Sequence, residues 1–433
     1  MEYLPIVLFA IIFLSMLFGY PVAFTLGGIS VLVGLWIFDI DFFYLLALRI
    51  YGVMNNFVLL AVPLFVFMGM MLEKSGLAER LLETMSLLFG KFRGGLAIAV
   101  ILVGALLAAS TGIVGATVVT MGLISLPTML NKGYGKGLAT GVIASSGTLG
   151  QIIPPSVVLV LLGSVLNVSV GDLFLAAVVP GIALVLVYLT YVVIYAKLRP
   201  AEIPKVSEEE LKAFRAQGIN FEIIKTFLFP FLLVLAVLGS IFAGIASPTE
   251  AAGVGAFGAM VLAAINGKLN LNILKTVSRE TTKITSMVFM ILVGATAFSL
   301  VFRGLEGDRY FLALIENSNL SPNQFLLVVM LMVFLAGFFI DFIEIIFIIV
   351  PIVTPIFVAM GVDLVWIGIL LAINLQTSFL TPPFGFALFY LKGVAPPEVK
   401  TTDIYRGIIP FVIIQLLFLL LLVQYPGIIL GKN

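Results

Sequence analysis

The feature that most constrains this chain is a succession of apolar segments, each about as long as a helix that crosses a lipid bilayer. An α-helix needs about 20 apolar residues to cross a hydrocarbon core of ~30 Å. Candidate spans lie at 3–19, 21–38, 57–73, 138–163, 173–196, 226–243, 249–265, 284–302, 364–391 and 408–428. Only 10% of the residues are charged, against roughly 25% in a soluble domain. The chain is therefore predicted to be an all-α polytopic protein embedded in a lipid bilayer.

The residue types that are missing exclude many chemistries. The sequence contains no histidine and no cysteine, so it offers no imidazole base, thiolate nucleophile or Cys-based metal centre. A formal net charge of +1 without a long basic run argues against nucleic acid as a partner, because nucleic-acid binding needs many cationic phosphate contacts. No phosphate loop of the form GxxxxGK(S/T) is present. We expect neither an enzyme nor an ATP-driven pump.

Two apolar stretches are too long for one span and too short for two. They cover residues 96–127 and 325–357, and at ~1.5 Å per residue each would form two half-depth helices. Their polar or glycine-rich centres are Ser110, Thr111 and Gly112 in the first and Gly337 to Asp341 in the second. Non-helical backbone at membrane depth is tolerated only where it is buried in protein or lines a wet cavity. Both stretches are predicted to be re-entrant helical hairpins.

The sequence contains an internal repeat. A shift of 228 residues places Pro127 on Pro355, Gly133 on Gly361, Pro154 on Pro382 and Pro155 on Pro383 without a gap. The matched prolines also occupy equivalent places in the hydropathy pattern of each half. Internal repeats with interrupted helices are typical of secondary transporters, whose sites lie near the bilayer midplane.

Charge indicates that the two repeats are inverted, because short cytoplasmic loops are enriched in Lys and Arg. The loop at 266–283 carries four basic residues, whereas its mate near 39–48 carries Asp39 and Asp41. The other matched loops also pair one basic member with one non-basic member. The chain is thus divided into a first repeat (1–196), a cytoplasmic linker (197–225) and an inverted second repeat (226–433). The N-terminus lacks the basic region of a signal peptide, and both termini are predicted to be extracytoplasmic.

Each repeat also contains a transmembrane helix interrupted by two prolines, at 138–163 and 364–391. The segments SSGTLGQIIPPS (Ser145 to Ser156) and NLQTSFLTPPFG (Asn374 to Gly385) place small polar residues directly before a Pro-Pro pair. Proline removes an amide donor and clashes with the preceding turn, so the pair unwinds the helix and frees carbonyl oxygens. Carbonyl and hydroxyl oxygens suit Na⁺, and exposed helix N-termini suit a carboxylate. The alternative is that Pro-Pro merely kinks each helix for packing.

Three carboxylates fall within apolar stretches. Asp341, at the second hairpin tip, could ligate a cation, carry a proton or simply cap the second helix of the hairpin. Glu344 lies one turn deeper, and we assign it no role. Glu250 follows Ser247 and Pro248, a pattern typical of a helix start in which Ser247 is the N-cap and Glu250 closes a capping box.

Two further segments mix apolar and charged residues immediately before each hairpin. They cover 77–89 and 305–315 and are predicted to be helices that lie in the membrane interface. Because they occupy equivalent places in inverted repeats, they are expected on opposite faces of the membrane. Such helices could frame a mobile unit.

Together these features resemble the large (DctM-like) membrane subunit of the tripartite ATP-independent periplasmic (TRAP) transporters over essentially the whole chain. The segment GIASPTEAAGVGAFGA, from Gly244 to Ala259, resembles that family's helix motif, and the paired hairpins and breaks fit its pattern. The resemblance implies an elevator-type transporter of the cytoplasmic (inner) membrane that imports an organic acid anion with Na⁺. It further implies a scaffold and a transport domain, the latter at roughly 94–170 plus 322–392.

The resemblance also implies partners and sites. The partners would be a small four-helix membrane subunit and a periplasmic substrate-binding protein. The first implied Na⁺ site comprises Ser110, Thr111, Gly112, Ser145, Ser146, Gly147 and Thr148. The second comprises Gly337, Asp341, Gln376, Thr377, Ser378 and Thr381. The two sets are not identical, because Ser110 falls on Phe338 and Ser145 on Ile373 under the 228-residue shift.

Other classes of protein share some of these features. A self-contained Na⁺/dicarboxylate symporter with two hairpins would look almost the same but would need no soluble partner. A channel fits less well, because dissimilar polar sets suit a closed site better than a continuous pore. An intramembrane enzyme would have to use carboxylates such as Asp341, and the first hairpin offers no second carboxylate.

Overall fold

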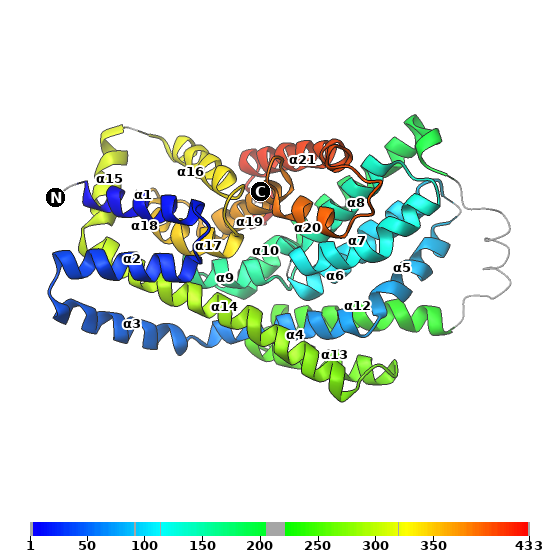
Figure 1. Ribbon diagram of the computed structural model, residues 1–433, viewed down its shortest axis with the longest axis horizontal. Helices are drawn as coiled ribbons and strands as arrows, with labels where there is room; N and C mark the ends of the chain where they lie inside the picture. Colours follow the sequence, from blue (N-terminus) through cyan, green and yellow to red (C-terminus); the bar gives the residue numbers. More distant parts are fainter. Residues whose placement is uncertain (1–2, 91, 113, 205–220, 319, 432–433) are drawn as a thin grey trace.

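The described part of the chain is entirely helical. The computed structural model describes residues 3–90, 92–112, 114–204, 221–318 and 320–431, and within these ranges it contains no β-strand (Figure 1). Residues 205–220 of the predicted linker lie outside the described ranges. The expected all-α membrane fold is confirmed in the residues that are described.

The helices of the first half are α1 (Leu4–Leu17), α2 (Val22–Ile37), η1 (Ile40–Phe43), α3 (Tyr44–Met54), η2 (Phe57–Leu60), α4 (Ala61–Lys74), α5 (Leu77–Leu88), α6 (Gly95–Thr111), α7 (Val114–Asn131), α8 (Lys136–Thr148), η3 (Leu149–Gln151), α9 (Val157–Leu166), α10 (Val170–Leu198) and η4 (Pro200–Glu202). Those of the second half are α12 (Phe221–Phe242), α13 (Pro248–Ile265), α14 (Leu271–Gly304), α15 (Gly307–Ser318), α16 (Pro322–Ala336), α17 (Phe342–Ile348), α18 (Val350–Ala359), α19 (Leu364–Leu380), α20 (Phe386–Val394), α21 (Thr401–Gln424) and α22 (Gly427–Leu430).

Equivalent helices of the two halves begin or end 228 residues apart. The matching boundaries are the starts of α7 and α17 (Val114, Phe342), the starts of α8 and α19 (Lys136, Leu364), and the ends of α9 and α20 (Leu166, Val394). One hairpin (α6 and α7) and the other (α16 with α17 and α18) approach the middle of the molecule from opposite ends of its long axis (Figure 1). α5 and α15 also lie at opposite ends. The two halves therefore have an inverted arrangement.

Two segments expected to be loops are helical, so those expectations were wrong. Residues 39–48 form η1 and the first part of α3, and residues 271–283 form the first third of α14. The side chain of Asn270 caps α14 by accepting a hydrogen bond from the amide of Ile273 at 2.9 Å. The basic residues of this segment therefore lie on a helix that extends beyond the apolar region. Hydropathy marks where a helix becomes apolar, whereas the cap marks where it begins.

The candidate spans vary in length more than the sequence predicted. Six helices in the described ranges are long and apolar enough to cross a membrane alone: Phe57–Lys74, Val114–Asn131, Val170–Leu198, Pro248–Ile265, Leu271–Gly304 and Thr401–Gln424. α1 and α2 have 14 and 16 residues, which at ~1.5 Å per residue is shorter than a hydrocarbon core. α17 and α18 form a pair bent by 49° at Ile349.

The helix start expected at Ser247 is confirmed. The amide of Glu250 donates to the Ser247 hydroxyl at 3.3 Å, and the Ser247 amide donates to the Glu250 carboxylate at 2.8 Å. These two bonds form a capping box at the first turn of α13. Glu250 is thereby explained as a structural residue.

α8 and α19 lie at the centre of the fold. Every residue from Leu138 to Thr148 and from Trp366 to Leu380 is buried. α8 packs against α6, α7 and α21, and α19 packs against α9, α16 and α21. Helices enclosed on all sides are ordinarily apolar all round, yet these two carry hydroxyl and amide side chains. Polar groups at such depth are expensive, which makes them candidates for function.

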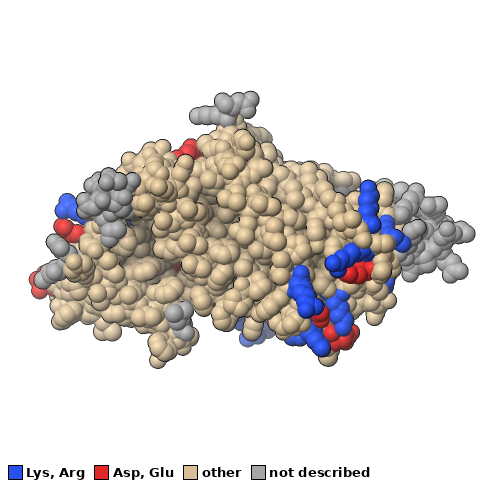
Figure 2. All heavy atoms as spheres, turned by 90° about the horizontal axis from the view of Figure 1, so that it is seen from above, with Lys and Arg blue, Asp and Glu red and all other residues tan. Residues whose placement is uncertain are grey.

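Charge is concentrated at the two ends of the molecule. Figure 2 shows a broad uncharged band between them, with most of the Lys and Arg at the end opposite α15. We refer to residues 94–170 and 322–392 as the hairpin unit and to the remaining described helices as the frame.

Candidate functional site

The first broken helix is interrupted between α8 and α9. η3 continues the chain past Thr148 for one turn, and α9 starts again at Val157. Ser156 bridges the break, because its hydroxyl donates to the Gln151 carbonyl at 2.9 Å and accepts from the Leu159 amide at 3.4 Å. Pro154 and Pro155 lie in the interruption and are joined by a cis peptide bond. The expected unwinding is therefore present.

The second broken helix is interrupted at the equivalent place, between α19 and α20. The Thr381 hydroxyl donates to the Thr377 carbonyl at 2.7 Å, and the Gly385 amide donates to the Thr381 carbonyl at 3.2 Å. Pro382 and Pro383 are also joined by a cis bond. The Pro383 carbonyl accepts from the Tyr405 hydroxyl of α21 at 2.6 Å, which ties this break to the frame.

The hydroxyl groups before the breaks are buried and satisfy their donor requirement within their own helix. In the first half, Ser145, Ser146 and Thr148 donate to the carbonyls of Val142, Ile143 and Ser145 at 2.9–3.2 Å. In the second, Thr377 and Ser378 donate to the carbonyls of Ile373 and Leu375 at 2.8 Å. Because each hydroxyl proton is used in a hydrogen bond to a carbonyl of the same helix, the hydroxyl oxygen keeps lone pairs that can coordinate a cation.

The hairpins contact the broken helices closely where a glycine allows it. A methyl group at Gly337 would overlap the Ser378 side chain, and one at Gly104 would lie 2.5 Å from the Ser146 hydroxyl. At the tip of the first hairpin, Gly112 has φ +61° and lies against Val157 at the start of α9. The structure thus brings together Gly337 and Ser378 as the sequence suggested, whereas Gly112 meets α9 rather than the Ser145–Thr148 segment.

Ser110 and Thr111 form the last turn of α6, and their side chains lie outside the described part of the structure. Gly147 lies against Val118 of α7, where a methyl group would be 2.6 Å from its side chain. Both arms of the first hairpin therefore touch the first broken helix.

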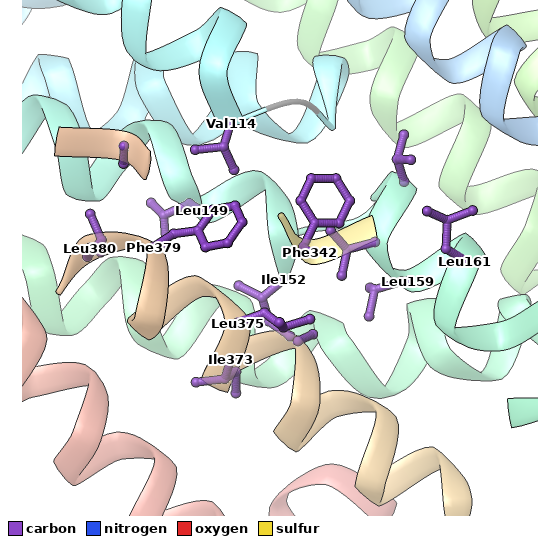
Figure 3. Close-up of a cluster of buried hydrophobic side chains, with 14 of the residues drawn as sticks. Val114, Leu149, Ile152, Leu159, Leu161, Phe342, Ile373, Leu375, Phe379 and Leu380 are labelled. Atoms are coloured by element: carbon purple, nitrogen blue, oxygen red, sulfur yellow. The ribbon is translucent and has the colours of Figure 1, made fainter. Parts of the chain in front are cut away.

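The two broken helices also meet each other. The Gln376 amide donates to the Thr148 hydroxyl at 3.5 Å, and these two residues are equivalent in the two repeats, 228 positions apart. Apolar side chains of the first break (Leu149, Ile152) face those of α19 (Leu375, Phe379) around this contact (Figure 3). Two-fold-related positions thus meet at the centre of the hairpin unit.

Sequence reasoning missed one residue of this centre, Gln151. Gln151 is fully buried, and neither its amide nitrogen nor its amide oxygen has a partner within the described residues. The Gln376 amide oxygen is also unpartnered there. The position of Gln151 within the SSGTLGQIIPPS segment indicated that it lies at the break. The sequence alone could not show that its side chain is buried rather than exposed.

A cavity of about 620 Å³ lies between the frame and the hairpin unit. The frame contributes α4 and α14, and the hairpin unit contributes α7, α9, α17, α19 and α20. The first residues of four helices line this cavity: Val114 of α7, Val157 of α9, Phe342 of α17 and Phe386 of α20. The first turns of α7, α9 and α20 contain no acidic residue. These helix N-termini bring partial positive charge to a cavity that Glu73, Glu280, Asp341 and Lys74 also line.

Asp341 caps the fourth of these helices. Its carboxylate accepts from the Phe342 amide at 2.6 Å, and its own amide donates to the Glu344 carboxylate at 3.1 Å. The structure therefore shows the capping role that the sequence offered as an alternative. Asp341 also lines the large cavity and a neighbouring one of about 450 Å³, which Glu344 lines as well. Asp341 is the acidic residue at the boundary between the two cavities.

One polar contact crosses the large cavity from the frame to the hairpin unit. The Thr120 hydroxyl of α7 donates to the Glu73 carboxylate of α4 at 2.9 Å. Lys74 lies 3.3 Å from the same oxygen, so the lysine charge is already paired. The sequence did not suggest this contact, because the partners are 47 residues apart in different units.

A helical membrane protein whose paired broken helices and hairpins direct several helix N-termini at one central cavity has the architecture of a transport permease. The chain matches the family described as "Tripartite ATP-independent periplasmic transporter, DctM component" over residues 9–428. It is 33% identical over 405 residues to the C4-dicarboxylate TRAP transporter large permease protein DctM of Pseudomonas aeruginosa, covering 93% of this chain and 92% of the relative. The isethionate TRAP transporter permease protein DctMQ of Oleidesulfovibrio alaskensis is 29% identical, with 98% of this chain but 65% of the relative covered.

A solved structure supports the fold independently. The YdaH transporter of Alcanivorax borkumensis superimposes with a TM-score of 0.63 at 15% identity, covering 94% of this chain and 96% of that one. This similarity concerns the fold alone. The sequence matches show that this chain belongs to the DctM family of TRAP transporter large permeases, which confirms the resemblance noted from its motifs, and the relatives are named as permeases rather than enzymes.

Proposed function

We propose that this chain imports an organic acid anion, such as a C4-dicarboxylate, sialic acid or a similar carboxylate, by coupling it to Na⁺. The observation that carries the proposal is the convergence of the starts of α7, α9 and α20, none of which has an acidic residue in its first turn, on one cavity between the frame and the hairpin unit. An anion there would be held by backbone amides and helix dipoles. Two relatives are named for C4-dicarboxylate and isethionate, both small organic anions, which fits this chemistry.

Na⁺ is proposed as the coupling ion because the donor atoms suit it. The two breaks present hydroxyl oxygens in fully buried positions. These are hard, neutral ligands, suited to a monovalent cation. One ion would lie near Ser145, Ser146 and Thr148, and the other near Gly337, Ser378 and Thr381. Na⁺ bound at these two positions would fix each hairpin against its broken helix. It would thereby position the helix N-termini that hold the anion.

The proposed mechanism is an elevator movement of the hairpin unit against the frame. The large cavity lies along the boundary between the two units. Two hydrogen bonds that cross this boundary between side chains are Thr120 to Glu73 and Asn56 to Ser164, at 2.9 and 3.1 Å. The Asn56–Ser164 contact joins two neutral groups, and such a hydrogen bond contributes only about 0.5–1.5 kcal/mol. Na⁺ entering down its gradient supplies direction, at ~2.3 kcal/mol per charge per 100 mV.

We also propose that the chain acts with two partners in the bacterial or archaeal inner membrane. A small four-helix membrane subunit would pack against the frame, and a periplasmic binding protein would deliver the anion. About a third of the isethionate relative is not matched by this chain, which leaves room for a second membrane component in that protein. The concentration of basic residues at the end where α10 ends and α12 begins (Figure 2) favours a cytoplasmic linker and extracytoplasmic termini.

The test is uptake into proteoliposomes. The chain would be reconstituted with and without an inward Na⁺ gradient, the small subunit and a candidate binding protein, with a panel of C4-dicarboxylates, sialic acid and sugar acids. Uptake that needs both the gradient and the binding protein supports the proposal. Gradient-driven uptake by the chain alone would indicate a self-contained symporter, and uptake indifferent to Na⁺ would rule out the ion sites.

A further inference from the structure

A second cavity lies along the same frame helix as the first, at a different depth. α14 contributes Thr276 to Val288 to the large cavity, and Leu292 to Ser299 to a separate cavity of about 370 Å³. The second cavity therefore lies nearer the end of α14 at Gly304, which is the end of the molecule that carries α15 (Figure 1). With the orientation proposed above, it faces the extracytoplasmic side.

Both units contribute polar side chains to this second cavity. They are Arg49, Asn56, Thr296 and Ser299 from the frame and Ser164 and Asn167 from α9 and its C-terminal end. The Asn56 amide donates to the Ser164 hydroxyl at 3.1 Å, so the two units are in contact at this cavity. The Thr296 hydroxyl donates its proton to the Leu292 carbonyl at 2.7 Å, so it is not a donor toward the cavity.

Arg49 is the charged residue of this cavity. Within the described residues its guanidinium has no ion pair and no hydrogen bond, and it is half-buried. Arg303 lies close enough to act on it electrostatically, and the carboxylate of Asp308 pairs with Arg303 at 3.3 Å. Two cations thus share one nearby carboxylate. A half-buried guanidinium with five unused donors is a strong site for an oxyanion, because it binds carboxylate oxygens in pairs.

We propose that the second cavity is an extracytoplasmic binding site for a free organic carboxylate, held by Arg49 with Asn56 and Ser299 as further hydrogen-bond donors. Its volume falls within the range of small-ligand pockets, and its mix of one cation with amides and hydroxyls fits a small hydroxylated or dicarboxylic acid. The inference rests on the proposed function only for the orientation of the protein in the membrane and for the direction in which the anion moves. If the chain imports an organic anion, the site would hold that anion after it arrives from the extracytoplasmic side and before it moves to the helix N-termini of the large cavity.

The proposal can be tested by the reactivity of the arginine itself. The full-length protein would be placed in nanodiscs of phosphatidylcholine, which carry no anionic headgroup, and treated with phenylglyoxal. Peptide mass spectrometry then gives the modification rate of each arginine. We expect succinate to slow modification of Arg49 several-fold and saturably, whereas succinamide, its uncharged analogue, leaves the rate unchanged.

Arg309 is the matched internal control. It lies on α15 at the same end of the molecule and is paired with Glu306 at 3.1 Å, away from the cavity. Its rate should not respond to succinate. Equal Arg49 rates in succinate and succinamide, or equal slowing of Arg309, would overturn the proposal. Because labelling needs neither a Na⁺ gradient nor a binding protein, a failure of Na⁺-driven uptake would leave this result unaffected.

A variant adds a functional readout. Replacing Arg49 by Gln removes the cation, and replacing it by Lys keeps the charge but not the paired geometry. We expect both variants to raise the succinate concentration needed for half-maximal uptake, Gln more than Lys, with the maximal rate largely kept. Unchanged half-maximal concentrations in both variants would contradict a site that lies on the path of the anion.

Discussion

Single glycines decide how closely the broken helices pack against their neighbours. A methyl group at Gly407 of α21 would overlap the Gly137 carbonyl, and one at Gly141 of α8 would overlap the Gly407 carbonyl. Small residues let helix backbones approach closely in a membrane, where no hydrophobic effect drives helices together. The prolines of the breaks could be interpreted from sequence because proline alters its own backbone. The role of these glycines could not, because it depends on a helix more than 200 residues away.

The first prediction concerns Gly407. Replacement by Ala should destabilise the protein by about 1–3 kcal/mol, the usual cost of forcing an extra methyl group into a packed contact. The thermal unfolding midpoint in detergent measures this. Gly28→Ala in α2 is the control, since nothing lies within 4 Å of its added methyl. A Gly407 variant as stable as the Gly28 variant would show that α8 and α21 do not pack as described.

The second prediction concerns the contact between Gly337 and Ser378. Gly337→Ala should push the second hairpin off its broken helix, because the new methyl meets the Ser378 side chain. We expect Na⁺-stimulated uptake to fall strongly. The double variant Gly337→Ala with Ser378→Gly, which restores the space, should regain hairpin contact but not the hydroxyl ligand. Full Na⁺ stimulation in the double variant would remove Ser378 from the second ion site.

At the scale of elements, the sequence predicted breaks and hairpins well but missed one helix. The interruptions fall where Pro154 and Pro382 require them, and the turn of the second hairpin, between Ala336 and Phe342, coincides with the predicted tip. The missed element, α3, follows Asp39 and Asp41, which a hydropathy reading assigns to a loop. A short helix preceded by a polar turn has no strong signal of its own, and packing against α14 stabilises it instead.

The third prediction separates the two roles of Asp341. Asp341→Asn keeps a good N-cap for α17 but removes the charge, whereas Asp341→Ala removes both, at a cost of about 0.5–2 kcal/mol for the lost cap. If Asp341 is an ion ligand, the Asn variant should keep the wild-type unfolding temperature and lose Na⁺ dependence of uptake. An Asn variant with normal Na⁺ dependence would assign Asp341 to capping alone.

At the scale of the whole molecule, the inverted repeat was readable from the sequence, but the cavities were not. The repeat leaves matched prolines and glycines at a constant offset. The cavities arise from contacts between distant segments, such as Thr120 with Glu73 and Asn56 with Ser164, which no local pattern encodes. The same applies to Gln151, whose amide acquires its importance only from complete burial. Candidate ligands could thus be named by type, while their assembly required the fold.

The central claim is that the hairpin unit moves as one body against the frame. The natural absence of cysteine makes this directly testable, because Asn56→Cys and Ser164→Cys place one thiol on each unit at a point of contact. In proteoliposomes, oxidation of the double variant should stop Na⁺-driven uptake and reduction should restore it, while uptake by each single variant should not change on oxidation or reduction. Full uptake with the disulfide formed, verified by mass spectrometry, would contradict movement of the two units past each other.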